Sequence, residues 1–179
     1  MSELNINDMV MINENSFSKV LTFLHKIESI NAKFIRIYYN QEQSHVTLTP
    51  KHLISVKSDN RSEFDYIAAN QVKIGDELNY FDLNLNKSQI VRVNRIELLE
   101  LNGIYAPLTE SGTLIVDNIY VSCYSLVKSH QAAHFFFNIL FIIKKFIMIS
   151  SDACLDYAKY LYDFVEYFKL SDLFLNIKS

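Results

Sequence analysis

Short runs in which β-branched and aromatic residues alternate with polar ones dominate the chain up to about residue 130. Each run ends at a polar turn, a pattern typical of β-strands. Gly75 and Gly112 stand between such runs and predict turns, because glycine adopts positive φ at little cost. The sequence therefore predicts a mostly β fold, with strands over the clearest runs, 34–39, 46–49, 53–56, 90–93 and 114–116.

A weak internal repeat runs through the same region. Three pairs of segments match in the same order along the chain: 4–10 with 72–78, 18–23 with 88–93, and 48–54 with 108–115. The second pair aligns Val20 with Ile90, and the third aligns Thr49 with Thr109. The shared order predicts two related β-subdomains in a pseudo-twofold arrangement. The alternative is that ordinary strand–turn–strand chemistry produces each match separately.

The pattern changes after residue 130. Residues 134–149 are nearly all apolar but carry Lys144 and Lys145, and the stretch is too short for a transmembrane span. Residues 151–168 have apolar side chains at helical spacing behind an N-cap signal, and this predicts an amphipathic helix. The helix either packs on the β-domain or binds a lipid or membrane face, and both interpretations remain open.

Composition excludes several classes of protein. The chain has 179 residues, half of them apolar, which suits one folded domain with a substantial core. A net charge of -3 without a basic stripe gives no reason to expect nucleic acid as a partner. Cys123 and Cys154 form neither a disulfide framework nor a metal motif. The first residues lack the basic and apolar regions of a signal peptide.

Candidate chemical groups lie at predicted strand ends. Thr49 and His52, three residues apart across a turn that contains Pro50, can converge on one buried site, where histidine can give or take a proton. His25 ends another strand-like run and is either a second base or an ordinary exposed histidine. Cys123 lies in an apolar segment, where a cysteine is usually a small core residue.

A metal site is not expected. His130 and His134 have the i, i+4 spacing of a helical metal pair, but no third ligand of a suitable type is evident nearby. We therefore predict no metal and no cofactor.

Several segments together resemble the C-terminal autoprocessing domain of hedgehog proteins, the Hint or Hog domain. The combination of Tyr-Ala-Pro-Leu-Thr at 105–109 with Ser-Cys-Tyr at 122–124 is highly specific, whereas Thr-x-x-His at 49–52 is shared by inteins and other Hint domains. The resemblance runs from about residue 4 to residue 135. It is weaker over 150–168, where Tyr157, Leu161 and Tyr162 resemble the sterol-recognition tail of the family.

The resemblance implies a mechanism. In the family, a cysteine at the start of the domain attacks the preceding carbonyl to form a thioester, and a sterol hydroxyl then displaces it. Thr49 and His52 would assist the first step, Cys123 would occupy the position of the second conserved cysteine, and the tail would present the sterol. The implied partners are a sterol, the N-terminal cargo of the same precursor and, through 135–168, a membrane surface. The implied setting is the secretory pathway or the outside of the cell.

The chain departs from the family at two positions. The leading cysteine and the first strand are absent, so the resemblance implies an N-terminally truncated domain that does not cleave itself. The Asp expected after the Phe-Leu pair, the base for the sterol hydroxyl, is replaced by His25. Whether the chain is an enzyme therefore stays open, and the alternative is a non-catalytic Hint-like module that binds a sterol, another lipid or a partner.

The sequence as a whole predicts a Hint-type pseudo-twofold β domain over 1–133, followed over 134–179 by an apolar helical tail that resembles a sterol-recognition region.

Overall fold

The computed structural model describes residues 1–57 and 63–125. The predicted helical tail of residues 134–179, the boundary at residue 133 and the membrane-binding stretch 135–168 lie outside the described residues. No helix in the described part of the chain is long and apolar enough to cross a membrane. The part that carries the predicted strands is described almost completely, and it is β-rich as expected.

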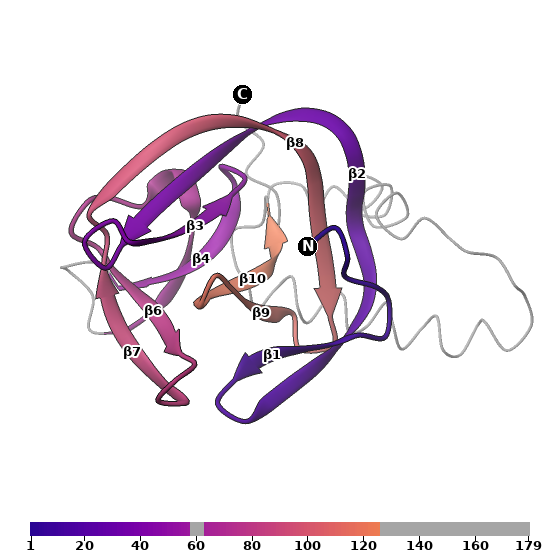
Figure 1. Ribbon diagram of the computed structural model, residues 1–179, viewed down its shortest axis with the longest axis horizontal. Helices are drawn as coiled ribbons and strands as arrows, with labels where there is room; N and C mark the ends of the chain where they lie inside the picture. Colours follow the sequence, from indigo (N-terminus) through magenta and orange to yellow (C-terminus); the bar gives the residue numbers. More distant parts are fainter. Residues whose placement is uncertain (58–62, 126–179) are drawn as a thin grey trace, which may run out of the picture. The chain divides into compact units, whose positions relative to one another are not determined.

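Ten strands and one short 3-10 helix make up the described residues (Figure 1). Their bounds are β1 Met9–Asn13, β2 Ser16–Tyr39, β3 Ser44–Leu48, β4 His52–Lys57, β5 Asp65–Ala68, η1 Ala69–Gln71, β6 Glu77–Asp82, β7 Lys87–Arg92, β8 Arg95–Thr109, β9 Thr113–Val116 and β10 Ile119–Ser125. Each of the five predicted runs overlaps a strand of this set.

Two long strands, β2 and β8, form an antiparallel ribbon. Their pairing runs from Val20 opposite Thr109 to Tyr38 opposite Arg95, with three register shifts along the way. Figure 1 shows the two strands side by side through a long curve. β1 pairs with the start of β2 and β3 with its end, so these four strands form one sheet.

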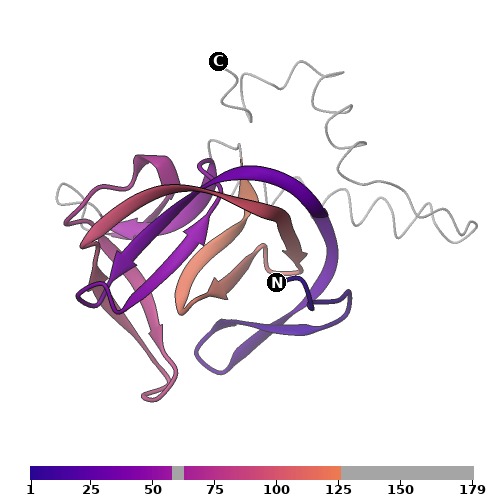
Figure 2. The same ribbon diagram turned by 45° about the horizontal axis from the view of Figure 1, so that its top comes forward.

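The remaining strands form a second sheet in the order β5-β4-β10-β6-β7, with β9 paired to β10 and an additional pairing of β4 with β6. The central strand β10 lies against β9 over four residue pairs, from Ile119 opposite Val116 to Ser122 opposite Thr113. Figure 2 shows β9 and β10 between the β1–β2 hairpin and the rest of this sheet.

The core lies between the elements that these pairings bring together. Its largest fully buried side chains are aromatic or branched and come from both sheets and, at Val93, from the link between β7 and β8: Tyr39, Phe81, Ile37, Ile54, Leu78, Leu108, Ile119, Val20, Val46, Val56, Val93 and Val121. The burial of such side chains is the main favourable contribution to folding.

The predicted pseudo-twofold relation is visible in matching hydrogen bonds. The Asp8 carboxylate accepts from the Asn5 amide, and the Asp76 carboxylate accepts from the Lys73 amide, both at 2.8 Å. The same two aspartates start equivalent strand pairings. The carbonyl of Asp8 accepts from Val20 and that of Asp76 from Val93, both at 2.9 Å. The first segment match, 4–10 with 72–78, therefore reflects two equivalent turns.

The second segment match has the wrong register. The sequence pattern aligns Val20 with Ile90, but the hydrogen bonds make Val93 the counterpart of Val20. Val20 and Val93 are both buried, whereas Ile90 is exposed. The error arises because Ile90 and Val93 lie three residues apart and have similar side chains, which the sequence alone does not distinguish.

The third segment match, 48–54 with 108–115, corresponds to two equivalent turns in the structure. The amide of His52 donates to the carbonyl of Thr49 at 3.0 Å, and the amide of Gly112 donates to that of Thr109 at 3.1 Å. Both turns follow a buried leucine, Leu48 or Leu108, at the end of a strand.

The repeat predicts how Gly75 responds to substitution. Gly75 has a φ of +94°, and its counterpart Asn7 has a φ of +76°. No atom within 4 Å would obstruct a Cβ at Gly75, so a substitution there tests backbone strain alone. We expect Gly75→Ala to lower the free energy of unfolding by about 1–2 kcal/mol. Gly75→Asn should cost less, because asparagine tolerates this conformation. Urea unfolding of both variants measures the difference, and equal stability of Gly75→Ala and the unchanged chain would contradict it.

Candidate functional site

The Thr49–His52 turn joins β3 to β4. Proline suits the second position of such a turn because its φ is already fixed near the required value. The turn closes through the hydrogen bond between the His52 amide and the Thr49 carbonyl. The Pro50 carbonyl also accepts a hydrogen bond from the Asn70 amide at 2.9 Å. The backbone that carries Thr49 and His52 is thus held from two sides.

The ring of His52 has one satisfied nitrogen and one free nitrogen. It donates a hydrogen bond to the backbone carbonyl of Ser122 in β10. Its Nε2 is buried and has no hydrogen-bond partner among the described residues. Burial lowers the pKa of His52 to about 4, against a smaller opposing effect of the Ser122 carbonyl. At pH 7 the ring is therefore neutral, with a lone pair on Nε2 available to a ligand.

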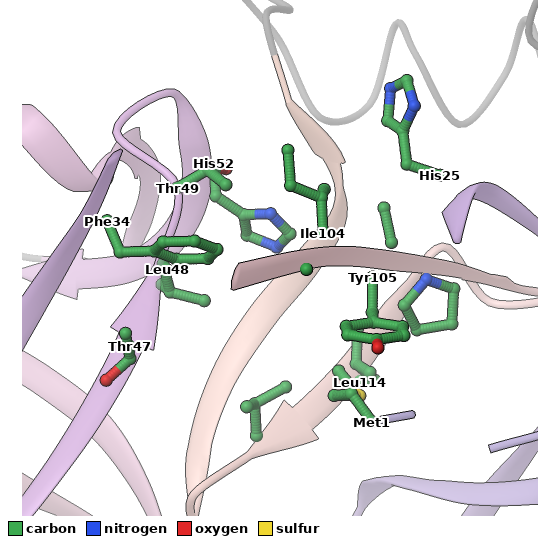
Figure 3. A pocket seen from close by; sticks show the side chains of 14 residues that line it. Met1, His25, Phe34, Thr47, Leu48, Thr49, His52, Ile104, Tyr105 and Leu114 are labelled. Atoms are coloured by element: carbon green, nitrogen blue, oxygen red, sulfur yellow. The ribbon is translucent and has the colours of Figure 1, made fainter. Parts of the chain in front are cut away.

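A cavity of about 140 Å³ lies next to this nitrogen. Thr49 and His52 line one part of it, and most of the remaining wall is apolar (Figure 3). The other lining residues are Met1, His25, Phe34, Thr47, Leu48, Gly103, Ile104, Tyr105, Ala106, Pro107, Leu114 and Val116. An unpaired buried nitrogen beside an apolar hollow is suited to a ligand that supplies the missing hydrogen bond.

His25 lines the same cavity but is exposed. In the β2–β8 ribbon it lies opposite Ala106. Figure 3 shows its ring pointing away from the His52 ring, on the other side of β8 from Tyr105. In this rotamer the His25 ring does not face His52, so a role as a base requires the side chain to turn.

Cys123 is buried in β10, and it is not among the residues that line the cavity. Its Sγ accepts a hydrogen bond from the Thr109 amide at 3.5 Å and lies 3.3 Å from the Thr109 hydroxyl. Burial raises the pKa of the Cys123 thiol to about 11, although the Thr109 hydrogen bonds act in the opposite direction. The group is therefore a neutral thiol at pH 7, one residue along the chain from the carbonyl that binds His52.

Two cavity residues, Gly103 and Tyr105, are not identified as site residues from the sequence. Gly103 has a φ of +88°, and a Cβ placed there would lie 2.9 Å from Cε2 of Tyr105. The Tyr105 ring therefore lies over the Gly103 backbone. The available signal is the spacing Gly-x-Tyr within the strand, since a glycine inside a strand often marks a close approach of another group.

The described residues contain no group of three or more His, Cys, Asp or Glu side chains that could hold a metal ion. The His130 and His134 pair lies outside them, as do Cys154, Tyr157, Leu161 and Tyr162.

Solved structures with the same arrangement of strands define the class of this domain. The crystal structure of the gp41-1 intein superposes with a TM-score of 0.53 at 13% identity, covering 68% of this chain and 84% of the intein. The crystal structure of an intein from a hyperthermophile gives a TM-score of 0.54 at 19% identity, covering 64% and 70%. These likenesses concern the fold, and they make this a Hint-type β domain.

The family follows from the sequence itself: the Hint module model matches residues 1–165, and the chain belongs to that family. Warthog protein 1 of Caenorhabditis elegans is 30% identical over 77% of this chain. Protein hedgehog of Drosophila pseudoobscura pseudoobscura is 32% identical over 75%, and Sonic hedgehog protein of Xenopus laevis is 30% identical over 68%. In each case the match covers 28% of the relative's length. The resemblance to hedgehog-type Hint domains is thereby confirmed.

The buried His52 predicts a pH dependence of stability. Its folded pKa of about 4 lies below the ordinary value of 6.5, so its neutral form stabilises the fold fully above pH 6.5. This contribution is lost as the pH falls toward 4. His52→Gln removes the titration, and we expect the stability advantage of the unchanged chain over this variant to shrink by about 2 kcal/mol between pH 7 and pH 4.5. Urea unfolding at both pH values measures it, and a constant difference would contradict the burial of this ring.

The environment of Cys123 predicts low thiol reactivity. In a Cys154→Ser chain, Cys123 is the one remaining thiol. Because it is buried and neutral, we expect an aromatic disulfide reagent at pH 8 to label it only slowly in the folded chain and rapidly in urea. Absorbance at the wavelength of the released thiol follows the reaction. Complete labelling of the folded chain within a minute would show that Cys123 is accessible.

Proposed function

We propose that this chain is a hedgehog-type autoprocessing domain in which Thr49 and His52 act on a peptide bond. The observation that carries the proposal is the neutral His52 ring, whose buried Nε2 lacks a partner among the described residues and faces a cavity also lined by Thr49. An amide group placed there would satisfy that nitrogen. Met1 lines the same cavity, so residues joined ahead of it would begin beside the cavity.

The proposed reaction has two steps. A cysteine thiol attacks the carbonyl carbon of the residue before it, the C–N bond breaks, and the released amine takes the thiol proton. His52 relays this proton, because a neutral imidazole can accept it from sulfur and return it to nitrogen. A hydroxyl then attacks the thioester carbon, a C–O bond forms as the C–S bond breaks, and the hydroxyl proton passes to sulfur. Thr49 orients the scissile carbonyl or amide.

The acceptor in this proposal is a sterol, as the resemblance to the hedgehog autoprocessing domain implies. Its base would be His25 after rotation of the side chain, and its binding region would include Tyr157, Leu161 and Tyr162. A membrane surface bound through 135–168 and a secretory or extracellular setting belong to the same proposal. The cavity of about 140 Å³ holds only part of such a molecule, since a hollow of roughly this size is filled by benzene.

A second candidate function is a non-catalytic Hint-like module that binds a sterol, another lipid or a partner. The mostly apolar wall of the cavity suits such a ligand. The Cys123 thiol is buried, neutral and engaged with Thr109, so it does not itself begin the first step of autoprocessing. An N-to-S acyl shift also needs the thiol on the residue that carries the scissile amide. The autoprocessing proposal therefore requires a cysteine joined ahead of Met1, and its test supplies one.

The test joins a reporter protein to Met1 of the full chain through a segment that supplies the leading cysteine and the first strand. We expect hydroxylamine, a strong small nucleophile, to release the reporter, as measured by intact mass. Thr49→Ala and His52→Ala should each slow this release by about 10²-fold or more, the range of general acid–base catalysis. Cholesterol in detergent then tests the acceptor separately, and His25→Ala should slow only that second reaction.

The matched control carries alanine in place of the added cysteine and should remain intact. Release that is equally fast with Thr49→Ala and His52→Ala would remove the proposed roles of these residues. No release with hydroxylamine or cholesterol, combined with saturable sterol binding, would favour the binding module.

A further inference from the structure

We infer that Tyr105 is a specificity-determining residue of the cavity, whose hydroxyl recognises a ligand that carries an alcohol group on a compact apolar body. The inference deepens the proposed function and rests on it, since such an alcohol would be the acyl acceptor. Its structural basis is the arrangement of Gly103, Tyr105 and His52.

Strand geometry sets the two sides of the cavity. Successive side chains of a strand point to opposite faces, so Tyr105 lies on one face of β8 and its neighbours Ile104 and Ala106 on the other. In the ribbon, Ala106 pairs with His25. Figure 3 shows the Tyr105 ring beside Leu114 and Met1, and the outward-turned His25 across the strand. In this rotamer Tyr105 and His25 therefore lie on opposite sides of β8.

Gly103 holds the Tyr105 ring in place. A Cβ at position 103 would lie 2.9 Å from Cε2 of Tyr105, 3.3 Å from its hydroxyl oxygen and 3.4 Å from the carbonyl oxygen of Glu28. Only a residue without a side chain leaves room for the ring there, and the φ of +88° also suits glycine. The hydroxyl therefore lies over the Gly103 backbone.

The polar groups of the cavity suit an alcohol. The Tyr105 hydroxyl makes no hydrogen bond with the described residues. His52 Nε2 is a buried acceptor on the same cavity, without a partner in the described part of the chain. Both groups suit an alcohol, because a phenol donates to the alcohol oxygen and an imidazole lone pair accepts the alcohol proton. The surrounding wall, which includes Phe34, Leu48 and Leu114, suits an apolar body about the size of a benzene ring.

The experiment measures binding to the full chain and needs no catalysis. The probes are benzyl alcohol and ethylbenzene, which differ by a hydroxyl in place of a methyl group. Amide NMR shifts of Gly103 and Leu114 give both dissociation constants. We expect the unchanged chain to bind benzyl alcohol more tightly than ethylbenzene. Tyr105→Phe should weaken the binding of benzyl alcohol about 3- to 10-fold and leave the dissociation constant of ethylbenzene unchanged.

Tyr80→Phe is the matched control, because Tyr80 is half-buried, hydrogen bonds to Asn118 and does not line the cavity. It should leave both constants unchanged. The inference is overturned if Tyr105→Phe keeps the preference for the alcohol, or if the unchanged chain shows no preference or no binding at millimolar concentrations. The two proposals can fail separately. If alcohol selectivity depends on Tyr105 but the cysteine fusion of the chain is not cleaved, autoprocessing is refuted and the alcohol-recognition site is retained.

Discussion

The pairing of β2 with β8 is the constraint on which the rest of the structure depends. It joins residues 20–38 to residues 95–109, and every other strand of the first sheet is attached to β2. At one end of the ribbon β2 leads to β3 and so to the Thr49 turn. At the other end β8 leads into the Thr109 turn. One long ladder of backbone hydrogen bonds thus sets the positions of both turns.

The same turn carries different side chains in the two halves of the domain. Thr49 is followed three residues later by His52, whose ring is fixed by Ser122 and kept neutral by burial. Thr109 is followed at the same distance by Gly112, and its hydroxyl and amide hold the Cys123 thiol. β10 connects the two, because Ser122 and Cys123 are adjacent. An acid–base group and a thiol are therefore kept apart in separate environments, although their supporting backbones are equivalent.

Much of this arrangement could be predicted from local pattern. The five predicted runs overlap strands. The turns at Asp8 and Asp76 are similar enough in sequence to be matched, and the structure shows equivalent hydrogen bonds in both. The middle of β2 could not be predicted in this way, since residues 26–31 are exposed on both faces and have no alternation to detect. The outward ring of His25 and the position of Tyr105 depend on side-chain packing across strands, which sequence spacing does not specify. Residues 126–179, which carry the predicted tail, lie outside the described part.

The long separation between β2 and β8 has a consequence for the order of events during synthesis. β2 ends at Tyr39 and its partner begins at Arg95, so a growing chain completes one side of the ribbon well before the other exists. At typical rates of translation the delay is roughly 3–11 s. Contacts so distant in sequence also form slowly. Until β8 is made, the Thr49 turn lacks the strand that walls its cavity. The topology therefore delays completion of the site until most of the domain has been synthesised.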